Sequence, residues 1–166
     1  MDCLSLGKNK GGNVMYRSIK TYGNERGLSC AFRQWRADSH CNLIHGYSLG
    51  FRITFEAAEL DERNWVYDFG DCKWIKKYLD EVFDHTLAIA EDDPELKVFK
   101  GLEKFDLANV VVMKGVGCEM FAEHVYNYIS SKVYSDTKGR VSVYSVEVFE
   151  HGSNSAICIN PYGSAV

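Results

Sequence analysis

Ser39–Leu49 reads Ser-His-Cys-Asn-Leu-Ile-His-Gly-Tyr-Ser-Leu, and a regular alternation of apolar and polar residues follows from it. Every second residue from Tyr47 to Phe55 is large and apolar, and small or polar residues stand between them. This period of two predicts a half-buried strand over 45–57. The stretch therefore predicts a fold built on a strand that begins at a loop.

The loop before this strand holds three reactive side chains within six residues, namely His40, Cys41 and His45. A strand that holds such groups at the edge of a loop is a common way to build a site. An inert thiol and two solvated imidazoles would explain the local sequence equally well. Motifs elsewhere in the chain are needed to decide between the two interpretations.

Composition limits the class of protein. The 166 residues match one domain, and 46% hydrophobic residues are typical of a globular chain. A net charge of -4 argues against a nucleic-acid partner, although a local basic pocket for a phosphorylated ligand stays open. No apolar run reaches the ~20 residues that cross a bilayer, and no signal peptide is evident, so we expect no membrane partner and a cytoplasmic location. The six cysteines form no C-x-x-C pair, so we expect reduced thiols and no zinc knuckle.

The pattern of periodic segments predicts an α+β domain over 16–166, preceded by a flexible arm over 1–15. Strands are expected first at 28–35 and 45–57, and later at 140–149 and 155–159, with a short buried strand at 110–113. Amphipathic helices are expected at 71–84 and 118–133. Paired strands around two helices indicate a four-stranded antiparallel sheet with both helices packed on one face.

Five short motifs, in order, resemble the 6-pyruvoyl-tetrahydropterin synthase and 6-carboxytetrahydropterin synthase family. The first is Cys41-Asn-Leu-Ile-His45-Gly46, similar to the family's Cys-x-x-x-His-Gly-His. The others are Asp68-Phe-Gly-Asp-Cys-Lys73, Phe83-Asp-His-Thr-Leu87, Cys118-Glu119 at a helix start, and Val148-Phe-Glu150. The matches span about 28–156, and the resemblance implies the tunnelling fold.

The resemblance also implies roles for five residues. Cys41 would be the base that removes a proton beside an incipient carbonyl, with Asp84 and His85 as the partner pair that relays protons. Glu119 and Glu150 would anchor the pterin by accepting two parallel N–H bonds. A helix C-terminal cap is the alternative for Asp84 and His85, and compensation of the helix dipole is the alternative for Glu119.

The zinc site that the family implies is incomplete here. Phe32 and Tyr47 stand at two of the three histidine positions, and only His45 remains. Three interpretations stay open: zinc held by a rearranged set such as His45 with His40 and Cys30, a metal-free site in which Tyr47 donates hydrogen bonds, or loss of the reaction.

Two nearby cations, Arg33 and Arg36, could receive a phosphate chain or could be surface arginines. The resemblance favours a 6-carboxytetrahydropterin synthase-like lyase that acts on 7,8-dihydroneopterin triphosphate on the route to queuosine and other 7-deazaguanines. The pyruvoyl reaction and a metal-free aldolase or epimerase activity are alternatives, as is a non-catalytic pterin- or purine-binding module. The resemblance implies a homotrimer or homohexamer with sites between subunits, and the open sheet edges predicted here would need such covering.

Overall fold

The computed structural model describes residues 14–160, so nearly all of the predicted N-terminal arm lies outside the described part. Seven strands and three α-helices follow one another within these residues. The strands are β1 (Tyr16–Tyr22), β2 (Leu28–Phe32), β3 (His45–Ala57), β4 (Thr86–Ala90), β5 (Val110–Met113), β6 (Ser142–His151) and β7 (Asn154–Ile159). The helices are α1 (Lys73–Phe83), α2 (Leu96–Leu102) and α3 (Cys118–Asp136).

The long strand β3 is the centre of the sheet. Its alternation predicts a half-buried strand, but all residues from Leu49 to Ala57 except Arg52 are buried. One edge of β3 pairs with β2 near its start and with β1 near its end, and the other edge pairs with β6. The sheet continues from β6 to β7 on one side and from β2 through β4 to β5 on the other. The α+β class is confirmed.

The predicted four-stranded antiparallel sheet is wrong, because the described residues form a seven-stranded mixed sheet. The β2–β4 and β4–β5 pairs are parallel, and the remaining pairs are antiparallel. All five residues of β4 are buried, so this strand lacks the alternation that marks a strand with one wet face. A parallel pair needs a crossover connection, and α1 and α2 provide it.

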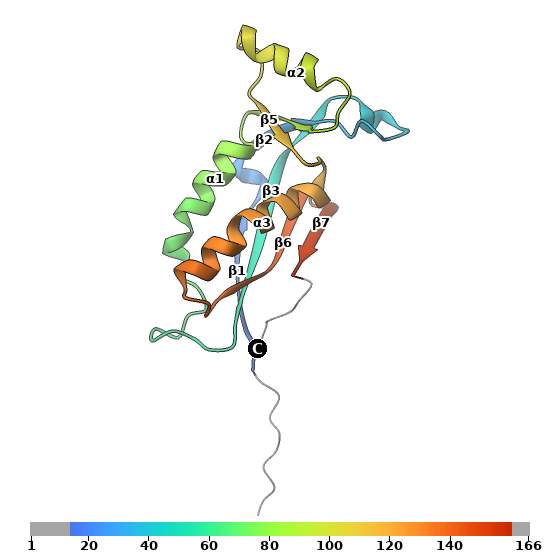
Figure 1. Cartoon of the computed structure of the whole chain (residues 1–166). Coiled ribbons are helices and arrows are strands. Elements are labelled where there is room, and N and C mark those ends of the chain that lie inside the picture. Colours follow the sequence, from blue (N-terminus) through green and yellow to red (C-terminus); the bar gives the residue numbers. More distant parts are fainter. Residues whose placement is uncertain (1–13, 161–166) are drawn as a thin grey trace, which may run out of the picture.

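Helices α1 and α3 lie side by side on one face of the sheet, as predicted (Figure 1). Their core contacts are aromatic: Phe51 of β3 packs on Phe83 of α1 at 4.8 Å between ring centroids, and Phe83 packs on Phe121 of α3 at 5.3 Å. Phe121 in turn contacts Phe32 of β2 at 5.2 Å. This chain of rings runs from the centre of the core to the end of the sheet where β3 begins.

Helix α2 was not predicted, and it forms a small satellite core in which Phe99 packs with Leu87 and Ile89 of β4. Among the residues described, no helix combines the length and the apolar character that a membrane crossing requires.

Candidate active site

Side chains from four segments meet at the end of the helix-covered face where β3 begins. The ring of Tyr47 lies 6.1 Å from that of His151, the residue after Glu150, and the charge of Glu150 adds to burial in raising the pKa of Tyr47. The thiols of Cys41 and Cys118 contribute to the same shift. The predicted base, one predicted anchor and Tyr47 are therefore gathered at the N-terminus of α3.

Glu150 reaches this site at an irregularity of β6. Phe51 pairs with Val148, which places Val148 on the helix-covered face, and the register of β6 shifts between Phe149 and His151, next to Tyr47. Glu150 is half-buried. Partial burial of a carboxylate costs free energy unless a hydrogen-bond donor faces it, and a bound ligand can supply such a donor.

Cys41 is positioned by a single turn of 3-10 helix, His40–Asn42. The Cys41 amide donates to the hydroxyl of Ser39 at 3.3 Å, and the Cys41 carbonyl accepts from the amide of Gln34 at 2.9 Å. These bonds fold the loop after β2 back towards the start of β3. The thiol is half-buried, as access to a substrate requires.

The His45-Gly46 pair of the motif is explained by packing against β2. A Cβ atom at Gly46 would stand 2.6 Å from the carbonyl oxygen of Cys30, so glycine is required there. Nδ1 of His45 lies 2.8 Å from the carbonyl oxygen of Leu43. A carbonyl oxygen can only accept, so Nδ1 carries the hydrogen and Nε2 of the neutral ring is a free acceptor.

The N-terminus of α3 contributes Cys118 and Glu119. Gly117 precedes them with φ of 104°, and the side-chain nitrogen of Gln34 lies 2.7 Å from where its Cβ would be. Burial raises the pKa of Cys118 to about 12, with the charges of Glu150 and Glu119 adding to the rise. Cys118 is therefore a thiol at neutral pH, which leaves Cys41 as the accessible candidate base.

Asp84 and His85 do form the predicted pair. Nδ1 of His85 lies 2.8 Å from a carboxylate oxygen of Asp84, which also accepts from the Ser29 amide at 3.4 Å. Burial opposes ionisation of Asp84, but the hydrogen bonds from His85 and Ser29 outweigh it and lower the pKa. His85 has a left-handed φ of 55°, and its ring is 86% exposed.

This pair lies apart from Cys41 within one chain. The Asp84 carboxylate accepts from the Ser29 amide near the start of β2, whereas the Cys41 carbonyl accepts from the Gln34 amide, beyond the end of β2 at Phe32. In residues 14–160 no hydrogen bond links His85 to Cys41. The exposed ring of His85 is available to another molecule.

The two predicted phosphate-binding arginines are both paired with carboxylates. Arg33 donates two hydrogen bonds to Asp93, at 2.8 and 2.7 Å, and the Asp93 side chain is fully buried. Arg36 is paired with Asp92 at 2.5 Å near the surface. Beside them lies a cleft of about 300 Å³ whose lining includes Gln34, Arg36 and Lys114.

The residues at the family's metal position do not fit zinc. Phe32 is fully buried, and its ring lies 4.8 Å from that of His45 and 6.2 Å from that of Tyr47. His40 is exposed, and the buried Cys30 thiol contacts Thr86, so the rearranged zinc set is not assembled. Across the described part of the chain, no three His, Cys, Asp or Glu side chains are grouped to hold a metal ion.

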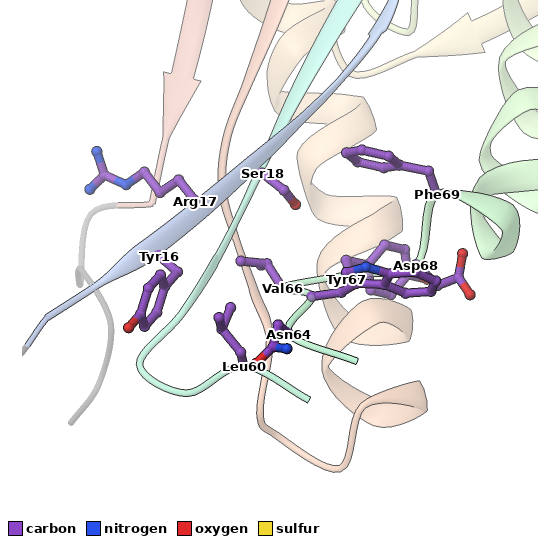
Figure 2. A pocket seen from close by; sticks show the side chains of 10 residues that line it. Tyr16, Arg17, Ser18, Leu60, Asn64, Val66, Tyr67, Asp68 and Phe69 are labelled. Carbon is purple, nitrogen blue, oxygen red and sulfur yellow. The ribbon is translucent and has the colours of Figure 1, made fainter. Parts of the chain in front are cut away.

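A separate groove of about 470 Å³ lies at the other end of β3, between β1 and the 60–69 loop. Figure 2 shows Tyr16 and Ser18 of β1 on one side of it and Tyr67 and Phe69 of the loop on another. No predicted site residue lines this groove.

Two residues near the site were not predicted as site residues. The ring of His151 lies 6.1 Å from that of Tyr47, and Gln34 contacts the turn before α3. His151 directly follows Glu150 in the sequence, which is a signal that could have identified it. Gln34 has no such signal, because it belongs to an irregular loop.

Known proteins resemble this chain in sequence and in fold. The 6-carboxy-5,6,7,8-tetrahydropterin synthases of Rickettsia typhi and Rickettsia bellii are 33% and 31% identical, over 58% and 66% of this chain and 70% and 78% of theirs. A solved Wolinella succinogenes protein described as uncharacterized has a TM-score of 0.75 at 23% identity, covering 89% of this chain and 99% of its own. The Plasmodium vivax 6-pyruvoyl tetrahydropterin synthase has a TM-score of 0.64 at 15% identity, covering 89% and 98%.

The model of the 6-pyruvoyl tetrahydropterin synthase family matches residues 23–160, which include every predicted site residue. The chain therefore belongs to the 6-pyruvoyl tetrahydropterin synthase family.

Proposed function

We propose that this protein is a 6-carboxytetrahydropterin synthase-like lyase that acts on 7,8-dihydroneopterin triphosphate. The observation that carries the proposal is the convergence of Cys41, Tyr47 and Glu150 at the N-terminus of α3, where Tyr47 also contacts the ring of His151 at 6.1 Å. The names of the Rickettsia relatives favour the carboxy over the pyruvoyl reaction. A place on the route to queuosine, in the cytoplasm, is part of the same proposal.

The pterin ring is held by carboxylates. Glu150 accepts two parallel N–H bonds from the 2-amino group and the ring N3–H, because a charged acceptor facing two donors makes a strong bidentate pair. Glu119 lies in the first turn of α3 next to Cys118 and adds a second acceptor at the same end of the site. Arg36 and Lys114, beside the adjoining cleft, attract the triphosphate.

The Cys41 thiolate is the base. It removes a proton from the carbon beside the incipient carbonyl of the side chain, and triphosphate leaves from the next carbon. An imidazolium near a thiol favours the thiolate, and His85, whose Nδ1 lies 2.8 Å from Asp84, is the imidazole that we assign to this role.

The pair comes from a second subunit. Within one chain the pair meets β2 near its start, at Ser29, whereas Cys41 is bonded to the loop beyond the end of β2. The exposed ring of His85 suits a contact between copies in a homotrimer or homohexamer.

Subunit complementation tests this arrangement. Cys41→Ala and His85→Ala are each expected to lose dihydroneopterin triphosphate turnover, and mixed, reassembled subunits of the two variants should regain part of it. A site that uses both residues of one chain would give no regain in the mixture. Chromatographic identification of the product separates the carboxy, pyruvoyl and aldolase or epimerase reactions.

A non-catalytic pterin- or purine-binding module is the second candidate. The replaced metal position favours it, because two of the residues that the family uses there are absent. Pterin binding without turnover by the parent protein, on any pterin triphosphate, would establish the module in place of the enzyme.

A further inference from the structure

Phe32, His45 and Tyr47 form a continuous wall on the helix-covered face of the sheet. Phe32 pairs with His45 across β2 and β3, and Cys30 pairs with Tyr47, so all four side chains share one face. The rings of His45 and Tyr47 meet edge to face at 5.9 Å. The ring of Phe32 contacts both of these rings and packs edge to face on the ring of Phe121 in α3.

This wall presents one acceptor and one donor. Nε2 of His45 is the acceptor, because the Leu43 carbonyl holds the hydrogen on Nδ1. The hydroxyl of Tyr47 is the donor, because a phenol carries one O–H group. Both side chains are half-buried, so a ligand can reach them while the rings stay ordered.

A metal ion would find a poor environment here. Zinc sites use three or four nitrogen, sulfur or oxygen ligands, and this wall offers one free imidazole nitrogen. The fully buried ring of Phe32 occupies a ligand position and cannot replace the water that a cation would lose.

We propose that His45 Nε2 and the Tyr47 hydroxyl bind the side-chain oxygen atoms of the pterin substrate directly, and that this protein works without zinc. The inference rests on the proposed function for the identity of the substrate. It assigns Tyr47 as a hydrogen-bond donor to a hydroxyl or carbonyl oxygen of the side chain. It assigns His45 as the acceptor from a neighbouring hydroxyl.

Zinc binding tests the first half without any assay of activity. Full-length protein dialysed against a chelator is titrated calorimetrically with zinc chloride, and its metal content as purified is measured by elemental analysis. The wild type should show no stoichiometric zinc, whereas Phe32→His/Tyr47→His, which restores three imidazoles, should bind about one ion per chain. One tightly bound zinc per wild-type chain, lost in His45→Ala, would overturn the proposal.

The double variant places a polar ring in the core, so its fold is checked by thermal melting. If it does not fold, Tyr47→His alone keeps Phe32 in place and sets a second imidazole beside His45. This variant should bind zinc more tightly than the wild type. Equal zinc binding by Tyr47→His and the wild type would contradict our inference that residue 47 stands where a zinc ligand would be.

Ligand binding tests the second half. The probes are 7,8-dihydroneopterin, which carries the hydroxylated side chain, and 7,8-dihydropterin, which lacks it. Tyr47→Phe should weaken binding of dihydroneopterin by about three- to tenfold and leave dihydropterin binding unchanged. Tyr134→Phe, an exposed tyrosine at the far end of α3, should change neither.

An equal loss for both probes in Tyr47→Phe, or no loss for either, would overturn the oxygen-binding role. If the wild type binds neither pterin, the proposed function and the role of Tyr47 both fail, and the zinc titration still decides whether the site is metal-free. If pterin binding discriminates as expected but no triphosphate is turned over, the lyase proposal fails alone and the inference stands.

Discussion

At the scale of single residues, the chemistry of the site depends on which thiol and which carboxylate the fold leaves accessible. Cys41 and Cys118 both lie near Tyr47. Burial and two neighbouring carboxylates hold Cys118 in the neutral form, whereas Cys41 is partly open to solvent. The two thiols should therefore differ in reactivity.

Cys41 should be alkylated by iodoacetamide at pH 8 well before Cys118 and Cys72. Thiolates are the reacting species, and burial raises the pKa of Cys118 to about 12 and that of Cys72 to about 11. Peptide mapping by mass spectrometry after timed alkylation measures the order, and urea-unfolded protein is the control in which all thiols react alike. Early modification of Cys118 in the folded protein would contradict the assignment.

Glu150→Gln should weaken binding of 7,8-dihydroneopterin by about 10- to 100-fold, because a neutral amide cannot accept two charge-assisted hydrogen bonds. Fluorescence titration measures the affinity. Glu147→Gln is the matched control, since Glu147 is on the same strand but is paired with Arg52. Similar losses in both variants would indicate a general effect of charge on β6.

At the scale of elements, the site depends on the close approach of β2 and β3. Gly46 and Ala31 face each other, and the missing Cβ of Gly46 lets the strands pair beside the Cys30 carbonyl. His45 and Tyr47 flank this contact. A change in strand separation here would move both side chains.

Gly46→Ala should lower the free energy of unfolding by about 1–3 kcal/mol, because the added methyl group would stand 2.6 Å from a backbone oxygen. Urea denaturation followed by circular dichroism measures the change. Gly101→Ala in α2 is the control: its Cβ would meet nothing within 4 Å, and alanine favours helix by about 1 kcal/mol. Equal stability of Gly46→Ala and the wild type would show that the strands can separate without cost.

At the scale of the whole molecule, ion pairs tie the added parallel strands to the rest of the sheet. Asp93, after β4, binds Arg33, after β2, and also accepts a hydrogen bond from the Glu95 amide at 2.8 Å. Hydrogen bonds from Arg33 lower the pKa of Asp93. This pair therefore holds the β4–α2 connection against the loop that carries Cys41.

Asp93→Asn should cost about 3 kcal/mol of unfolding free energy, because it leaves a partly buried guanidinium without its charged partner. Asp92→Asn, which breaks the exposed pair with Arg36, should cost less than about 1 kcal/mol. Urea denaturation of both variants at pH 7 measures the difference. Equal costs would mean that burial of the Arg33–Asp93 pair is unimportant.

Stability should fall as the pH decreases from about 7 towards 3. Burial lowers the pKa of His124 below its ordinary value of 6.5. Below about pH 6.5 the unfolded chain therefore binds more protons than the folded chain, and the free energy of unfolding decreases as the pH falls from there. The pKa of Asp93 is also lowered, so its contribution is present above the ordinary value of 3.8 and is lost as pH falls through the folded value. Urea denaturation midpoints, measured across this pH range, should decrease less below pH 4 in Asp93→Asn than in the wild type. The same pH profile in both proteins would contradict the contribution that we assign to the ionisation of Asp93.

The sequence by itself determined the central strand, the two long helices and the identity of the motif residues. Its information is strongest where apolar and polar residues recur with a regular period, as in β3 and α1. The same period predicts that Glu150 shares the face of Val146 and Val148. The missing zinc ligands were also readable, since Phe32 and Tyr47 are replacements in a short motif.

Only the tertiary structure decided what neighbours those residues have. Strand β4 is buried on both faces, so no periodicity marks it, and its parallel pairing follows from long-range packing. The separation of Asp84 and His85 from Cys41, and the pairing of Arg33 and Arg36 with Asp93 and Asp92, depend on segments far apart in the chain. The sequence pattern shows which side chains each helix or strand carries. Contacts between these elements form only when the chain folds and its core packs.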